Sequence, residues 1–353
     1  MAMSTQLVPN EFIVVLQDDA DVGQGAAHAR GHGAEVVAEW ASALHGYAVR
    51  GGPAVIAAIR SDEDVQYVEQ SQEYSIETTQ TGATWGLDRI DQHDLPLSGT
   101  YSYNSNGAGV HAYIIDTGIL TSHNEFGGRA SFGANFANGN SNDCNGHGTH
   151  VAGTVGGSTY GVAKGVLLVA VKVLNCAGSG TTTGVISGIN WVAAHAIKPA
   201  VANMSLGGGA STSLDNAVNN AINSGVTFAV AAGNSNANAC NYSPSRAAAA
   251  ITVGATTSTD ARASYSNFGS CVDIFAPGSS ITSAWRTSNT ATNTISGTSM
   301  ATPHVTGVAA LYLQTHAGDS PATVRNALVN NATNGVISNV GSGSPNKLLF
   351  TNY

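Results

Sequence analysis

Short, nearly continuous apolar runs dominate the second part of the chain. They predict strands over residues 110–116, 166–174, 200–206, 226–234 and 251–255. Amphipathic patterns typical of helices separate several of these runs, over residues 181–197 and 212–225. Strands that are apolar on both faces and alternate with helices indicate a parallel sheet covered by helices. We therefore expect an α/β layered fold for this part.

The first part of the chain shows a different and shorter pattern. The residues predict a strand at 11–17, a weak helix at 25–40, a strand at 45–51, a helix at 53–61 and a strand at 65–71. Such a pattern suits a small α+β unit, with two helices on one face of a sheet. The polar stretch SIETTQTGAT, residues 75–84, follows as a boundary region.

Charge and cysteine content divide the chain at the same place. Residues 1–77 hold 12 acidic and 3 basic residues and no cysteine, whereas residues 78–353 hold 10 of each charge and all four cysteines. We therefore expect two domains, 1–77 and 78–353. We also expect the protein to be a monomer. The acidic balance argues against nucleic acid or an anionic membrane as a partner. No apolar run approaches the roughly 18 residues of a membrane span.

The opening MAMSTQLVPNEF lacks the basic start and apolar stretch of a signal peptide. Either the protein stays inside the cell, or a signal was removed before this sequence begins. The cysteines favour the second alternative. They form no CxxC pair, which argues against zinc, and four cysteines allow three disulfide pairings. Since disulfides persist in oxidising compartments, we expect a secreted protein.

Three polar residues lie where the predicted elements end or begin. Asp116 ends a strand, His147 opens the segment HGTHVAGTVGG, and Ser299 precedes a long apolar helix pattern. Each has an ordinary alternative: a turn-forming Asp, a zinc ligand paired with His150, and a helix-capping Ser. Together they supply a nucleophile, a base and a group that orients the base. A serine becomes a good nucleophile when an imidazole takes its proton, and a carboxylate holds that imidazole.

The chain order Asp, His, Ser is the order found in subtilisin. The segments IIDTGI, NGHGTHVAGT and SGTSMATPHV resemble the three active-site signatures of subtilisin-like serine proteases. WGLDRIDQ, ANMSLGGG, AAGNSNA and FAPGSSI are similar to the proteinase K branch, close to aqualysin and the Vibrio-type enzymes. The resemblance covers residues 78–353 almost throughout and implies a parallel-sheet, three-layer subtilisin-like fold.

The resemblance also implies roles for single residues. Asp116 would be the orienting acid, His147 the general base and Ser299 the nucleophile, and Asn234 would donate to the oxyanion together with the Ser299 N–H. Two backbone edges would pair with an extended peptide substrate, and their residues are Gly178, Ser179, Gly180, Ser205, Leu206 and Gly207. With Ala232 and Gly233 in the wall, the primary pocket is apolar. We expect an endopeptidase of broad specificity on proteins and peptides, with an apolar or aromatic residue before the cut bond.

Structural calcium is the cofactor that the resemblance implies. One site would use Asp88, Asp91, Gln92 and Ser98, which offer the hard oxygen ligands that calcium prefers. A second would use the Asp273 carboxylate with the carbonyls of Ala248 and Ala250. The alternative for each carboxylate is an ordinary Asp in a solvated turn. The same resemblance implies the disulfides Cys144–Cys176 and Cys240–Cys271.

Residues 1–77 resemble the propeptide of the family, which assists folding and inhibits the enzyme until it is cut off. The mature chain would then begin at Thr78, and the enzyme would process itself near residue 77. Glu77 fits an apolar pocket poorly, whereas Tyr74 would lie four residues before the cut. Two other function classes fit the sequence less well. An inactive, inhibitor-like binding protein conflicts with the complete triad, and an esterase of another fold conflicts with the chain order.

Overall fold

The computed structural model describes residues 7–72, 78–137 and 139–353. The chain divides into two units, Met1–Ile76 and Glu77–Tyr353. None of the helices within the described residues has the length and apolar character needed to span a bilayer.

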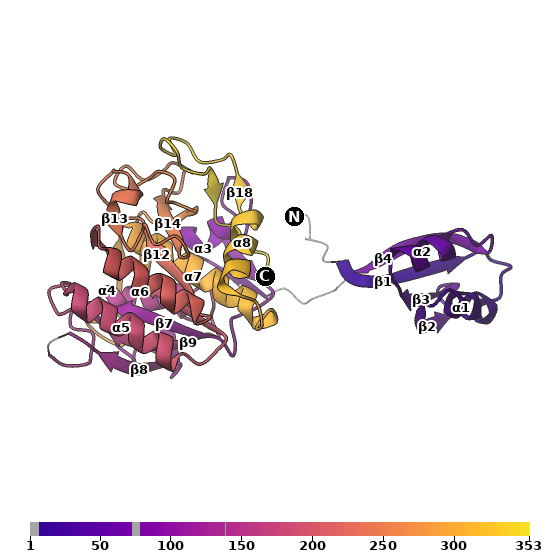
Figure 1. Cartoon of the computed structure of the whole chain (residues 1–353), viewed down its shortest axis with the longest axis horizontal. Coiled ribbons are helices and arrows are strands. Elements are labelled where there is room, and N and C mark those ends of the chain that lie inside the picture. Colours follow the sequence, from indigo (N-terminus) through magenta and orange to yellow (C-terminus); the bar gives the residue numbers. More distant parts are fainter. Residues whose placement is uncertain (1–6, 73–77, 138) are drawn as a thin grey trace. The chain divides into compact units, whose positions relative to one another are not determined.

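Unit 1 is a four-stranded antiparallel sheet in the order β2-β3-β1-β4, with two helices (Figure 1). In chain order, its elements are β1 (Leu7–Leu16), α1 (Val22–Gly31), β2 (Glu35–Trp40), β3 (Gly46–Arg50), α2 (Pro53–Arg60) and β4 (Val65–Gln72). Val14 and Leu16 of β1 share one apolar cluster with Ala26 of α1 and Ile59 of α2. Both helices therefore cover the same face of the sheet.

The helix predicted over 25–40 is too long. α1 ends at Gly31, the turn that follows contains Gly33 with a φ of +89°, and residues 35–40 form the edge strand β2. Exposure alternates along β2, with the even-numbered residues partly buried. A period of two and the pair Val36-Val37 favour a strand, and the tight turn separates it from the helix.

Unit 2 is built on a nine-stranded sheet in the order β18-β19-β15-β14-β12-β10-β7-β9-β8. Its strands are β7 (His111–Asp116), β8 (Ala130–Asn135), β9 (Leu167–Lys172), β10 (Ala200–Met204), β12 (Thr227–Ala231), β14 (Ile251–Thr256), β15 (Ile274–Pro277), β18 (Thr333–Asn334) and β19 (Lys347–Leu348). All neighbouring strands pair in parallel except β18 and β19. The five predicted apolar strands form its continuous middle, β9-β7-β10-β12-β14.

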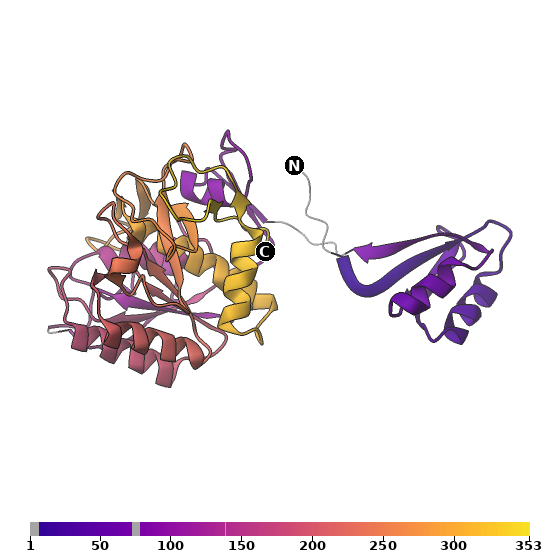
Figure 2. The same cartoon turned by 45° about the horizontal axis from the view of Figure 1, so that its top comes forward.

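Alternate side chains of β7 enter two different apolar clusters. Tyr113 and Ile115 of β7 pack with α5 (Thr182–His195) and α6 (Thr212–Asn223), which lie side by side along one face (Figures 1 and 2). Ala112 and Ile114 belong to the cluster that contains α4, α7 and α8. The bounds of these helices are His147–Gly156, Thr298–Thr315 and Pro321–Asn331. The unit thus has the three layers expected from the sequence.

The remaining elements are short and lie outside the main layers. They are β5 (Thr78–Thr81), α3 (Trp85–Ile90), β6 (Thr100–Tyr103), η1 (Asn124–Phe126), β11 (Gly208–Gly209), η2 (Ala239–Asn241), β13 (Tyr242–Ser243), β16 (Ile281–Ala284) and β17 (Thr292–Ile295). Two disulfides, Cys144–Cys176 and Cys240–Cys271, join loops of this unit, and they are the pairs that the resemblance implies.

The geometry of a parallel sheet brings the predicted site residues to one edge. Asp116 is the last residue of β7, and Asn234 follows the carboxyl end of β12. His147 and Ser299 lie in the first turns of α4 and α7, whose amino ends lie at that edge. The contact of His147 with Asp116, and the hydrogen bond from Thr298 to Asn234, join these helix starts to the strand ends.

Arg89 connects α3 to a distant loop through a buried ion pair. Its side chain is fully buried, and Nε and Nη2 donate to the two carboxylate oxygens of Asp260 at 2.7 and 3.0 Å. Nη1 and Nη2 also donate to the carbonyls of Gln92 and His93 at 2.6 and 3.1 Å. The guanidinium thereby holds residues 89–93 against the loop around residue 260.

We expect Arg89→Leu to destabilise unit 2 by about 3–5 kcal/mol, because it leaves the Asp260 carboxylate without its buried partner. Adding Asp260→Asn should recover part of this loss, since it removes the uncompensated charge. Asn also tolerates the left-handed conformation of residue 260, whose φ is +56°. Urea unfolding of the full chain and both variants measures the difference. A double variant no more stable than Arg89→Leu would contradict this explanation.

Candidate active site

Asp116 and His147 form a buried charge-assisted pair. The imidazole Nδ1 lies 2.8 Å from Oδ1 and 3.0 Å from Oδ2 of Asp116, whose side chain is completely buried. The Thr117 N–H donates to the same Oδ1 at 2.7 Å. Because the carboxylate accepts the Nδ1 proton, Nε2 is the basic nitrogen of the neutral ring. The His147 side chain remains 25% exposed, so this nitrogen can meet a substrate.

The surroundings of His147 act on its pKa in opposite directions. Burial lowers the pKa, but the charge of Asp116, the hydrogen bond to it and the charge of Asp143 together outweigh burial. The net result is a pKa above the ordinary value of histidine. His150, the other histidine of the motif, differs. Burial lowers its pKa to about 4, and its Nε2 donates to the carbonyl of Ile281 at 3.0 Å.

Asp143 is a functional residue that the sequence analysis did not select. Its buried carboxylate accepts from the Gly146 N–H at 2.8 Å and from the N–H and hydroxyl of Thr149 at 3.0 and 2.6 Å. It also accepts from the Thr117 hydroxyl at 2.9 Å. The carboxylate thus caps α4, where the helix dipole favours negative charge. The available signal was an Asp four residues before the helix that opens at His147.

Ser299 is half-buried in the first turn of α7. Its hydroxyl donates to the Ser205 carbonyl at 3.2 Å, and the Ser205 hydroxyl donates to the Ser299 carbonyl at 2.8 Å. The Ser299 hydroxyl is therefore hydrogen-bonded to the backbone of the loop after β10. Among the described residues this hydroxyl makes no hydrogen bond to His147, and unmade or loose catalytic hydrogen bonds are common in proteins without substrate.

Asn234 is held by the start of α7. Its side-chain oxygen accepts from the Thr298 N–H at 2.8 Å and from the Thr298 hydroxyl at 2.9 Å. The amide nitrogen therefore lies on the other side of the group, as a donor. A Cβ built on Gly297 would lie 3.5 Å from that nitrogen and 3.6 Å from the Ser299 backbone nitrogen. The missing side chain of Gly297 leaves open the space between the two donors.

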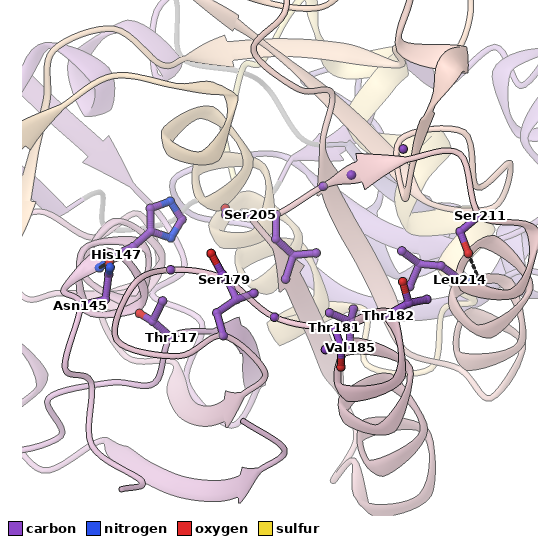
Figure 3. A pocket seen from close by; sticks show the side chains of 17 residues that line it. Thr117, Asn145, His147, Ser179, Thr181, Thr182, Val185, Ser205, Ser211 and Leu214 are labelled. Carbon is purple, nitrogen blue, oxygen red and sulfur yellow. Dashed lines mark hydrogen bonds between the residues drawn. The ribbon is translucent and has the colours of Figure 1, made fainter. Parts of the chain in front are cut away.

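Two neighbouring hollows contain the residues predicted to bind substrate. The first, of about 470 Å³, lies between Gly178–Gly180 and Ser205–Gly207 and is also lined by His147 (Figure 3). The second, of about 340 Å³, lies between Leu206–Gly209 and Ala231–Asn234 and is lined by Ser299. Among its described lining residues, none has an ionised side chain. Both predicted backbone edges and the residues predicted to line the primary pocket therefore adjoin the catalytic candidates.

The predicted calcium residues near α3 surround one loop. Asp88 accepts from the N–H and hydroxyl of Ser98 at 3.0 and 2.9 Å, and from the Gly99 N–H at 2.6 Å. Asp91 accepts from the Ser102 N–H at 2.7 Å, and the Gln92 side-chain oxygen accepts from the Ser98 N–H at 3.2 Å. Within the described residues, no three His, Cys, Asp or Glu side chains gather as metal ligands. The predicted ligands of this site remain two carboxylates with an amide and a hydroxyl oxygen, which are ligand types that calcium takes.

The second predicted calcium site does not fit the structure. Arg325 of α8 donates to Oδ1 of Asp273 and, through Nη1, to the Ala248 carbonyl at 3.0 Å. The Thr252 N–H donates to the other Asp273 oxygen at 2.8 Å. Ala250 lies buried in the same loop. A guanidinium thus contacts two of the three residues expected to bind the ion.

Known proteins resemble this chain over most of its length. The model of the subtilase family, Peptidase_S8, matches residues 107–347. The extracellular serine proteinase of Thermus sp. (strain Rt41A) is 55% identical, over 99% of this chain and 91% of that protein. The alkaline serine exoprotease A of Vibrio alginolyticus is 56% identical, over 87% of this chain and 59% of that protein.

A solved structure extends the likeness to three dimensions. The crystal structure of a cold adapted subtilisin-like serine proteinase matches with a TM-score of 0.75 and 58% identity, and covers 77% of this chain and 100% of that chain. These matches confirm the resemblance carried by the three motifs, the subtilisin-like fold and the serine endopeptidase activity. The chain belongs to the subtilase family.

Proposed function

We propose that Asp116, His147 and Ser299 form the catalytic triad of this serine endopeptidase. The observation that carries the proposal is the 2.8 Å contact between Asp116 and His147 at the sheet edge where α7 presents Ser299. Ser299 Oγ attacks the peptide carbonyl while His147 Nε2 takes its proton. The imidazolium, held by Asp116, returns that proton to the leaving amine. This leaves the acyl group on Ser299 Oγ. Water then attacks the acyl carbonyl while His147 Nε2 takes its proton, and the imidazolium returns that proton to Ser299 Oγ as the acid is released.

The Ser299 N–H and the Asn234 amide nitrogen would stabilise the oxyanion formed by this attack. The evidence for this role is the geometry around Gly297, where both nitrogens border one open space. Asn234 is fixed by two hydrogen bonds from Thr298, so its donor needs no reorganisation during the reaction. Fixed donors of this kind provide the electrostatic stabilisation on which acyl transfer depends.

The two hollows would bind an extended peptide. Gly178–Gly180 and Ser205–Gly207 offer backbone on both sides of the first hollow, which favours main-chain pairing over reading of single side chains. The second hollow, next to Ser299 and free of ionised lining among its described residues, would take an apolar or aromatic side chain before the cut bond. Together these features support broad endopeptidase specificity.

Residues 1–77 would be a propeptide that the enzyme removes itself. Unit 1 has its own sheet and its own apolar cluster, as a separable inhibitor requires. Tyr74 and Glu77, which bear on the position of the cut, lie outside the described residues. Thr78, the proposed first residue of the mature chain, begins β5 and pairs with Tyr103 of unit 2. The name of the Thermus relative and the two disulfides support secretion.

Calcium would bind at the loop formed by Asp88, Asp91, Gln92 and Ser98. The oxygen-only donor set supports this role, and the ion would supply charge compensation that holds residues 88–102 together. The loop contains no triad residue, so the ion would act on stability and take no part in the chemistry.

We expect Ser299→Ala in the full chain to fold, to lose peptidase activity and to remain unprocessed near residue 77. The substitution removes the nucleophile and leaves both hollows intact. The measurements are fluorophosphonate labelling, peptide hydrolysis and mass spectrometry after refolding with calcium. Ser296→Ala removes a nearby exposed hydroxyl and should label and mature like the unchanged chain. Labelling of the Ser299→Ala chain would refute the nucleophile, and cutting near residue 77 without other proteases would refute self-processing.

The raised pKa of His147 predicts the acid limb of the pH profile. Protonated His147 cannot accept the Ser299 proton, so kcat/KM should fall as pH drops through a pKa above the ordinary value of about 6.5. Asp116→Asn removes the main attraction for the extra proton. The fall of kcat/KM on the acid side should therefore move to lower pH. In addition, kcat should fall about 10⁴-fold, as for comparable triads.

Asp319→Asn is the control for this titration. Asp319 accepts a hydrogen bond from Tyr312 near the opposite end of α7, and its substitution changes the net charge by the same amount. Its acid limb should match that of the unchanged enzyme. An Asp116→Asn limb at unchanged or higher pH would contradict the assignment of His147 as the base.

We expect Gly297→Ala to lower kcat by about 10²–10³-fold with little change in KM. The new methyl group would occupy the space between the two oxyanion donors, and the magnitude is that known for losing one such donor in subtilisin itself. The φ of Gly297, 161°, is extended backbone that alanine adopts without strain. Gly318→Ala, where nothing lies near the added methyl, is the matched control. Full kcat in Gly297→Ala would place the oxyanion elsewhere.

A further inference from the structure

Asp273 lies at a junction of three segments of unit 2. It immediately precedes β15, and it exchanges two hydrogen bonds with Thr252 of β14. The Asp273 N–H donates to the Thr252 carbonyl at 2.9 Å, and the Thr252 N–H donates to Asp273 Oδ2 at 2.8 Å. The third segment is α8, which supplies Arg325 to the other carboxylate oxygen. The Asp273 side chain is 15% exposed, so its charge is largely removed from water.

Arg325 reaches this junction with two different nitrogens. Nη2 donates to Asp273 Oδ1, and Nη1 donates to the Ala248 carbonyl at 3.0 Å. The guanidinium therefore spans from the carboxylate to the loop that precedes β14. Ala250 belongs to the same loop, where its N–H donates to the Ala247 carbonyl at 3.1 Å. The Arg325 guanidinium thus joins the Asp273 carboxylate to the Ala248 carbonyl, two of the groups that a metal bound at the predicted site would join.

Calcium and this guanidinium compete for the same oxygens. Calcium takes six to eight oxygen ligands at roughly 2.3–2.6 Å, whereas a guanidinium offers donors and no acceptor. With Arg325 in place, the Asp273 and Ala248 oxygens already accept its protons. A dication in the same position would also meet a permanent positive charge, because arginine does not lose its proton in proteins.

We propose that Arg325 is the built-in cation of this junction and that it excludes calcium there. The guanidinium neutralises Asp273 and fastens α8 to the loop before β14 and to the start of β15. The strength of this connection is then independent of calcium concentration. The proposal rests on the proposed calcium role of the loop around Asp88 only in that this loop would then be the one of the two predicted sites that binds calcium.

The test counts calcium ions and does not rely on peptidase activity. Full chains carrying Ser299→Ala, which blocks self-digestion, are freed of metal and titrated with calcium by calorimetry. We expect Asp273→Asn to bind as many ions as its parent, and Arg325→Ala to bind one more. Adding Asp273→Asn to Arg325→Ala should remove that additional ion. Arg246→Ala is the matched control, because it removes another partly exposed ion pair, the one between Arg246 and Asp215. It should leave the number of bound calcium ions unchanged.

Thermal unfolding gives a second readout. In EDTA, Arg325→Ala should melt a few degrees below its parent, and excess calcium should restore more of its midpoint than calcium adds to the parent. Either of two results overturns the proposal. One is an Asp273→Asn chain that binds one ion fewer than its parent. The other is an Arg325→Ala chain that folds but gains no calcium. The first comparison keeps Arg325 in place and stays decisive if Arg325→Ala fails to fold.

Discussion

The buried Asp143 carboxylate is the contact on which the geometry of the site depends. It binds Thr117, the residue after the strand that ends in Asp116, and it binds Gly146 and Thr149 around the start of α4. The end of a strand and the start of a helix are thereby fixed to one charged group. The short distance between Asp116 and His147 follows from this arrangement. The same negative charge also contributes to the raised pKa of His147.

The sequence predicted the middle of the large sheet well, because the strand patterns reflect burial on both faces. Residues 110–116 and 251–255 show this, and they correspond to β7 and β14. Short strands such as β18 and β19, of two residues each, have no detectable period, so they were missed. In unit 1, the pattern predicts a helix through residues 35–40, which form a strand, because a small-residue helix and an alternating edge strand adjoin with only a tight turn between them.

In the candidate site, too, local sequence patterns reveal only some of the residues that matter. Asp116, His147 and Ser299 could be selected because each carries reactive chemistry at the end of an element. Asp143 acts through five hydrogen bonds whose partners are spread over residues 117–149, and a local pattern does not reveal such contacts. Arg325 lies 52 positions from Asp273, and nothing in the helix pattern of residues 321–331 distinguishes it from a solvated surface arginine.

The helix that carries Ser299 is buried along almost its whole length, from Thr298 to Leu313. A reactive group placed on a surface loop could separate from its partners through local fluctuations. Here, exposing the apolar body of α7 requires the loss of the main apolar cluster, so this helix opens together with the whole of unit 2. For a proteinase this matters directly. Molecules that retain a working nucleophile keep this segment shielded from their neighbours, and cutting within it follows the rare global opening of unit 2.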